Sequence, residues 1–253
     1  MHLAVPLILM ACLASTNFIS PSFYKRLVIE DGAVEYATVG VYLIGFFWGL
    51  GLARKLHAKR ELAWTVVYAG MSFGFLLIAL EEISWGQRIF GLETPEFFKG
   101  RNIQGEIGVH NLSSLRLLLS PAYIAIGFGG AFGSLILSRL GVPARSLERL
   151  LPPPRLFLYF VPCFIFYIAA EIISPFTTIR YTGELGAVYG GKLDDPRGVL
   201  ALPAHVLDVV RDWFPMWSGM GGKKFTLWRH QEPAEFLLSL GFLFFVVFRS
   251  RKE

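Results

Sequence analysis

The chain has 253 residues, of which 54% are hydrophobic and only 17% charged, and its mean hydropathy is +0.51. Soluble domains carry about a quarter charged residues, so this composition excludes a soluble globular protein and predicts a polytopic membrane protein. The net charge of +5 does not indicate a nucleic-acid partner. Excess Lys and Arg on the cytoplasmic loops of a membrane protein produce the same total, and the sequence has no basic-aromatic nucleic-acid motif.

Six apolar segments follow one another along the chain, each near the roughly 20 residues that a helix needs to cross the hydrocarbon core. The first is the shortest, and a cleaved signal peptide is its alternative reading because small residues follow the apolar stretch. No Lys or Arg precedes it, so we predict a retained helix. The expected fold is all-α, a single integral membrane domain over residues 1–253 with about six transmembrane helices, at about residues 3–19, 33–53, 62–80, 115–137, 156–173 and 234–248.

The distribution of basic residues predicts the orientation of these helices. Arg54–Glu61 contains four basic residues and one acidic residue, and Arg139–Arg155 also contains four basic residues and one acidic residue. The tail at 249–253 adds three more basic residues. With six helices these segments share one side, which the positive-inside rule makes cytoplasmic. We therefore expect both termini in the cytoplasm.

A long loop at residues 175–233 is expected on the outer side. Within it, Leu202–Trp217 alternates apolar and polar residues at roughly helical spacing and contains Trp213 and Trp217. Tryptophan is enriched at the level of the lipid headgroups. The segment therefore predicts an amphipathic helix that lies on the membrane surface.

In this topology, ionisable residues from several helices reach one level, at the outer ends of the spans. A carboxylate within the bilayer costs about 2.5 kcal/mol or more, so it normally faces the interior of the bundle or water. Acids at helix ends are also common as plain interfacial residues, and that alternative stays open. The candidates for catalysis are Glu81, Glu82, His110 and Glu171, and those for binding an anionic substrate are Gln87, Arg88, Arg116, Arg180 and Arg229.

Two short strings also offer ligands for a metal ion. GEIGVHN contains Glu106 and His110, and RHQEPAE contains His230, Glu232 and Glu235. Histidine and carboxylate ligands from separate helices fit a divalent metal such as zinc, with a water molecule held for hydrolysis. Without a metal, a pair of carboxyl groups could act as general acid and base. The sequence leaves both alternatives open.

Several motifs together resemble a group of uncharacterised bacterial polytopic membrane proteins: EDGAVEY at 30–36, EEISWGQRIFGLETPEFF at 81–98, NIQGEIGVHNL at 102–112, and RHQEPAE at 229–235. The resemblance spans most of the chain and implies a multi-pass protein of the bacterial inner membrane, with no established activity. A looser resemblance links the chain to ceramidase and progestin-receptor-like membrane hydrolases. Those proteins have seven helices and a zinc ion held by three histidines, whereas only His110 and His230 are well placed here.

Three functions are compatible with these features. The first is a hydrolase or transferase that acts on a membrane lipid or lipid-linked substrate at the outer leaflet. The second is a proton-coupled or small-molecule transporter, because carboxylates within spans are typical of proton relays. The third is a non-catalytic assembly or sensor subunit, with homo-oligomers formed through glycine-rich helix faces such as GFGGAFG at 127–133.

Overall fold

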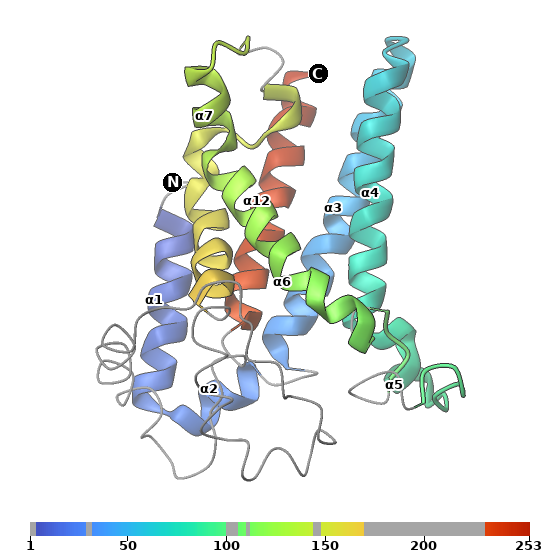
Figure 1. Ribbon diagram of the computed structural model, residues 1–253, viewed down its shortest axis with the longest axis vertical. Coiled ribbons are helices and arrows are strands. Elements are labelled where there is room, and N and C mark those ends of the chain that lie inside the picture. The colour runs from blue at the N-terminus through green and yellow to red at the C-terminus, as the bar shows by residue number, and fades with distance from the viewer. Residues whose placement is uncertain (1–3, 29–31, 100–105, 110–111, 144–147, 170–230) are drawn as a thin grey trace.

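The chain folds into a bundle of helices that stand side by side (Figure 1). The computed structural model describes residues 4–28, 32–99, 106–109, 112–143, 148–169 and 231–253, and at residue 21 and residues 113–117 it describes the backbone alone. Every regular element within these ranges is helical, so the expected all-α fold is confirmed. The helix expected at 202–217 lies outside the described residues.

Five helices within the described ranges are long and apolar enough to cross a membrane: Ala33–Ala58, Leu62–Glu82, Leu118–Arg139, Glu148–Ala169 and Gln231–Lys252. A shorter apolar helix, α1 (Ala4–Ile19), has 16 residues and leads into α2 (Pro21–Leu27). Many large apolar side chains point away from the bundle, including Phe47 and Val66, which are 68% and 71% exposed. Such an apolar outer surface is suited to lipid rather than water. The protein is therefore a multi-pass membrane protein.

The helices α3 (Ala33–Ala58) and α4 (Leu62–Glu82) form the most extensive pair, and α12 (Gln231–Lys252) packs against α3. The third span comprises α6 (Ser113–Phe128), the π-helical η2 (Gly129–Gly133) and α7 (Ser134–Arg139). The fourth is the stretch 148–169, which contains η3 (Pro154–Leu156). Successive spans run in opposite directions, so each end of the bundle gathers helix ends from distant parts of the sequence (Figure 1).

The helices extend beyond the apolar segments that predict them. The second apolar segment ends at residue 53, but α3 continues to Ala58; similarly, α12 covers 231–252 where the sequence predicts 234–248. Hydropathy identifies only the part of a helix that lies in hydrocarbon. The backbone hydrogen bonds of the helix continue past it into a charged turn, because an α-helix satisfies its backbone groups wherever it runs.

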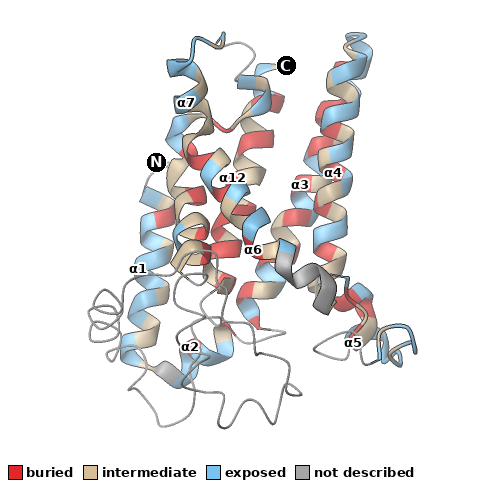
Figure 2. Ribbon diagram, viewed as in Figure 1, coloured by how far each residue is buried: buried red, intermediate tan, exposed pale blue. Residues whose placement is uncertain are grey.

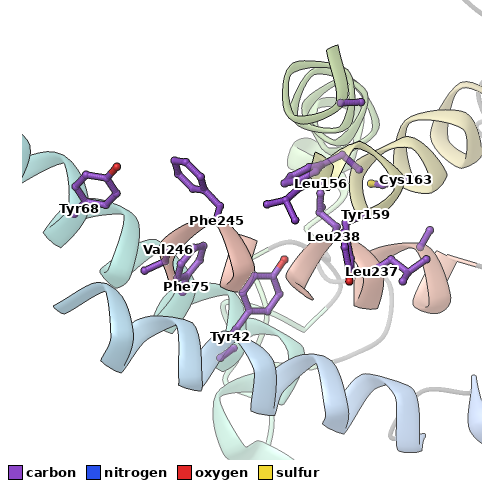
Figure 3. Packing of buried hydrophobic residues seen from close by; sticks show 14 of the residues in the cluster. Tyr42, Tyr68, Phe75, Leu156, Tyr159, Cys163, Leu237, Leu238, Phe245 and Val246 are labelled. Carbon is purple, nitrogen blue, oxygen red and sulfur yellow. The ribbon is translucent and has the colours of Figure 1, made fainter. Parts of the chain in front are cut away.

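The core between the helices is aromatic and closely packed. Buried residues face neighbouring helices while the outward faces are exposed (Figure 2), and the largest buried cluster joins Tyr42 and Phe75 to Tyr159, Leu238 and Phe245 (Figure 3). Between α3 and α4 the contact is closer still, because a Cβ atom at Gly49 would lie 2.2 Å from the Ser72 hydroxyl. Small residues that let helix backbones approach are the usual means of association in a membrane.

The basic segments meet at one end of the bundle and are tied together by ion pairs. Lys59 lies 3.0 Å from the Glu253 carboxylate and Arg149 lies 3.2 Å from it, while Lys55 donates to the Ser250 carbonyl at 2.8 Å. Burial by itself raises the pKa of Glu253, but its contacts with Lys59, Arg249 and Arg149 outweigh this effect and hold that pKa below its usual value. The carboxylate thus stays ionised and joins α3 to the end of α12.

Candidate functional site

A left-handed turn follows α4 directly after Glu82. In η1 (Ser84–Gly86), three consecutive residues have positive φ angles, at 47° for Ser84, 56° for Trp85 and 76° for Gly86. Glycine adopts this conformation freely, but a serine and a tryptophan there each cost about 1–2 kcal/mol. The short α5 (Gln87–Phe90) then carries the chain away from the bundle. Surrounding contacts must hold such a turn in place.

Glu106 supplies the first of these contacts. Its side chain is buried and accepts hydrogen bonds from the Ser84 hydroxyl and from the Arg88 guanidinium. The Arg88–Glu106 pair bridges the segment after α4 and the segment 106–109. Because a buried carboxylate is stable only when it is paired, these bonds fix the two segments against each other.

Two further side chains from the same motif bind the backbone of this segment. The Gln87 side-chain oxygen accepts a hydrogen bond from the Ile107 backbone N–H at 2.6 Å, and one Glu81 carboxylate oxygen accepts one from the Val109 backbone N–H at 2.7 Å. The other Glu81 oxygen accepts the Trp85 indole N–H, also at 2.6 Å. Five residues of the EEISWGQR motif therefore stabilise the turn and residues 106–109, and together with Glu106 we call them the scaffold: Glu81, Ser84, Trp85, Gln87 and Arg88.

Glu82 takes a different direction and joins a cluster of carboxylates. One carboxylate oxygen from each of Glu82, Glu232 and Glu235 lies within 4.8 Å of the other two. Glu82 is the last residue of α4, while Glu232 and Glu235 are three apart in the first turns of α12, which places them on one helix face. Glu232 is 9% exposed and Glu235 6%. We call these three residues the carboxylate cluster.

Tyrosine side chains form the wall beside this cluster. Tyr167 donates a hydrogen bond to Glu235, and the Tyr123 ring stacks on that of Tyr167 with centroids 4.4 Å apart. Tyr42 is only 4% exposed and interacts electrostatically with Glu82 and Glu235. Its ring points from α3 toward α12 (Figure 3), and its hydroxyl makes no hydrogen bond to any described residue. The wall is thus apolar in its rings and polar at the hydroxyl groups.

The charge of the cluster determines what it can bind. The groups that act most strongly on Glu82 are themselves carboxylates, namely Glu235, Glu232, Glu35 and Glu81, and none of these contributors is a Lys or Arg. Carboxylates this close cannot all remain ionised in a region of low dielectric unless a proton or a cation compensates them. Oxygen ligands suit hard divalent cations such as Mg²⁺, Ca²⁺ and Mn²⁺, whereas zinc prefers added nitrogen or sulfur ligands.

The structure separates the predicted site residues into two groups. Glu82 and Glu235 lie in the carboxylate cluster, whereas Glu81, Gln87, Arg88 and Glu106 lie in the scaffold. Only the backbone of Arg116 is described. The other predicted residues lie outside the described ranges: His110, Glu171, Arg180, Arg229 and His230.

The RHQEPAE string also contributes Glu232, which lies in the cluster three residues before Glu235 on the same helix. The tyrosines beside the cluster are residues that the sequence does not single out. Tyr42, Tyr123 and Tyr167 come from three different spans, and their convergence has no local signal. A tyrosine in an apolar segment is far more often a packing residue than part of a polar wall.

Comparison of the chain with protein-family models, with curated proteins and with solved structures finds no match. The resemblance to uncharacterised bacterial membrane proteins therefore stays a prediction. The carboxylate cluster and its tyrosine wall are the features on which a function can be based.

Proposed function

We propose that this protein is a membrane-embedded hydrolase or transferase that acts on a lipid or lipid-linked substrate, with the carboxylate cluster as its centre. The observation that supports the proposal is the mutual approach of Glu82, Glu232 and Glu235 within 4.8 Å at the end of two spans. Carboxylates within a membrane domain are costly, and they mark functional sites more often than structural ones. A divalent cation bound by the cluster would compensate their charge and could activate water.

The position of the cluster favours a substrate at the membrane surface. It lies at the end of α4 and the start of α12, opposite to the end where Lys59, Arg149 and Glu253 meet. If the basic end is cytoplasmic, as the positive-inside rule predicts, the cluster faces the outer leaflet of the bacterial inner membrane. His110 and His230 are candidates to complete the ligand set, since each adjoins a described segment of the site.

In this proposal the residues of the chain have distinct tasks. Glu82, Glu232 and Glu235 would hold the cation, which would supply Lewis acidity when bound. Tyr167 orients the Glu235 carboxylate through its hydrogen bond. The Tyr42 hydroxyl, which has no partner among the described residues, is available to a substrate oxygen. The scaffold around Glu106 holds the turn that follows α4 against residues 106–109.

The test uses purified full-length protein, with Mn²⁺ as the probe and its electron paramagnetic resonance signal as the readout. Glu82→Gln should weaken Mn²⁺ binding by at least about tenfold and should lower turnover of a total membrane lipid extract by about a hundredfold or more. Glu96→Gln is the matched control, because Glu96 is an exposed acid of the same region with an 85% exposed side chain. Equal Mn²⁺ binding by the two variants would contradict the metal centre, and unchanged lipid in every sample would contradict the enzyme.

A proton-coupled transporter is the second candidate, and one observation favours it. Glu82 makes no hydrogen bond within the described part of the chain and is surrounded by carboxylates, as a proton-binding group would be. Toward the basic end, however, the described core is mostly apolar, with residues such as Leu156, Phe160 and Val246, which does not favour proton transfer along the bundle. Proton movement in proteoliposomes that is abolished by Glu82→Gln would replace the enzyme proposal with this one.

A further inference from the structure

A pocket lies at the basic end of the bundle, at the opposite end of α12 from Glu232 and Glu235 of the carboxylate cluster. Its volume is about 330 Å³, and it is formed between the beginning of the fourth span and the last turns of α12. Its charged lining residues are Glu148, Arg155, Arg249 and Lys252. Three cations against one carboxylate give the pocket an excess of positive charge.

Two of the cations are already engaged. Lys252 lies 2.6 Å from Glu148, and Arg249 is buried, pairs with Glu253 and lies 3.9 Å from Glu148. Arg155 differs, because its guanidinium forms no ion pair among the described residues. It lies instead over the Phe248 ring, with 4.0 Å between the guanidinium carbon and the ring centroid. This stacking orients its N–H groups while leaving them available for a further partner.

The rest of the lining is apolar. Phe245 and Phe248 from α12 and two prolines that precede Arg155 contribute to the walls. A pocket with cations and an apolar wall, at the end of transmembrane helices, matches the chemistry of a phospholipid, whose phosphate and first acyl carbons lie next to each other. Basic pockets between helices on the cytoplasmic side are known to bind anionic headgroups.

We propose that this pocket binds the phosphodiester headgroup of an acidic phospholipid, with Arg155 as the main contact to the phosphate. Arginine is suited to this role because its planar guanidinium can donate two parallel hydrogen bonds to phosphate oxygens. Arg249 and Lys252 add positive charge, and Phe245 and Phe248 contact the upper part of the acyl chains. The site is independent of the proposed catalytic centre and would persist if that centre had no activity.

Native mass spectrometry of the full-length protein in a neutral detergent tests this proposal. The probes are phosphatidylglycerol and phosphatidylcholine with identical acyl chains, so that only the headgroup charge differs. The wild-type protein should prefer phosphatidylglycerol, and Arg155→Gln should weaken that binding by about fivefold while leaving phosphatidylcholine unchanged. Arg139→Gln is the matched control, because Arg139 is an exposed arginine at the end of α7 that does not line the pocket.

Several outcomes would overturn the proposal. Equal binding of the two lipids would do so, as would equal losses in Arg155→Gln and Arg139→Gln, which would indicate general surface attraction. Inorganic phosphate that displaces phosphatidylglycerol at similar concentrations would show a free-phosphate site instead. If Arg155→Gln does not fold, two other variants test the site. Arg155→Lys should keep the preference for phosphatidylglycerol, and Lys252→Gln, which changes a half-exposed side chain, should reduce it. If neither result is observed, the proposed site is refuted.

Discussion

Glu81 and Glu82 are adjacent in the chain, but their carboxylates serve different parts of the structure. Successive residues of a helix point about 100° apart, so two acids at the end of α4 cannot share one environment. Glu81 binds Trp85 and the Val109 amide in the scaffold, whereas Glu82 enters the carboxylate cluster. The direction in which each side chain points therefore distinguishes Glu81, which has a structural role, from Glu82, which is a candidate catalytic residue.

Glu106 provides the residue-scale test of this division. Replacing it with alanine removes the acceptor for Ser84 and Arg88, and the loss of buried bonds to a charged group costs about 1–3 kcal/mol. We expect Glu106→Ala to lower the unfolding temperature in detergent and to accelerate hydrogen exchange at residues 106–109. Mn²⁺ binding by the folded variant should stay within about twofold of wild type.

Glu96→Ala serves as the control for that experiment, because Glu96 is exposed and its pair with the nearby Lys99 lies on the surface. Should Glu106→Ala abolish Mn²⁺ binding without changing hydrogen exchange, Glu106 would be a metal ligand as the sequence predicts. The scaffold role would then be wrong.

At this scale the sequence predicts which residues are unusual better than it predicts their partners. Their place at the ends of apolar spans makes Glu82 and Glu235 candidates, because a carboxylate within a membrane domain is costly. The left-handed turn at Ser84 and Trp85 has no such signal, because neither residue favours a positive φ. Without that turn, nothing indicates that Arg88 folds back to Glu106 rather than facing a substrate.

At the scale of elements, the third span shows how glycine allows two helices to approach. A Cβ atom at Gly130 would lie 2.1 Å from the Phe160 ring, and one at Gly127 would lie 2.8 Å from the Phe164 backbone nitrogen. The sequence predicts close packing at this glycine run, within or between chains. The structure uses Gly127 and Gly130 within the chain, while a Cβ atom at Gly129 would meet nothing within 4 Å.

The neighbouring glycines Gly129 and Gly130 therefore make a matched pair. Gly130→Ala forces Phe160 to move, and such overpacking costs about 1–3 kcal/mol. Gly129→Ala should leave the unfolding temperature unchanged or raise it, because alanine favours helical structure over glycine by about 1 kcal/mol. Thermal unfolding of both variants in the same detergent measures the difference.

The oligomeric state of the two variants gives a second readout. If Gly129→Ala is the more destabilised and also dissociates an oligomer, the open face of this span contacts another copy of the chain. If the two variants behave alike, the contact between Gly130 and Phe160 does not limit stability, and the packing described for this span would be wrong.

At the scale of the whole molecule, the two ends of the bundle differ in charge and in construction. One end joins α3, α12 and the fourth span through Lys59, Arg149, Arg249 and Glu253. The other end gathers the carboxylate cluster and its tyrosine wall. Composition and loop charge predict this polarity because insertion depends on summed hydropathy and charge. They cannot predict that Tyr42, Tyr123 and Tyr167 meet, since that depends on how the helices pack.

The polarity leads to a prediction about orientation, on which the outer-leaflet substrate depends. Single cysteines at Ala58 and at Glu96 would report the two ends, because both residues are exposed: Ala58 is the last residue of α3, and Glu96 lies in a turn that follows α4 and α5. Cys12 and Cys163 are first replaced by serine and alanine so that they do not react. In intact cells, a membrane-impermeant maleimide should label Glu96→Cys, and should label Ala58→Cys only after permeabilisation, since the positive-inside rule keeps the basic end in the cytoplasm. The reverse pattern would place the carboxylate cluster on the cytoplasmic side, and the substrate would then have to come from the inner leaflet.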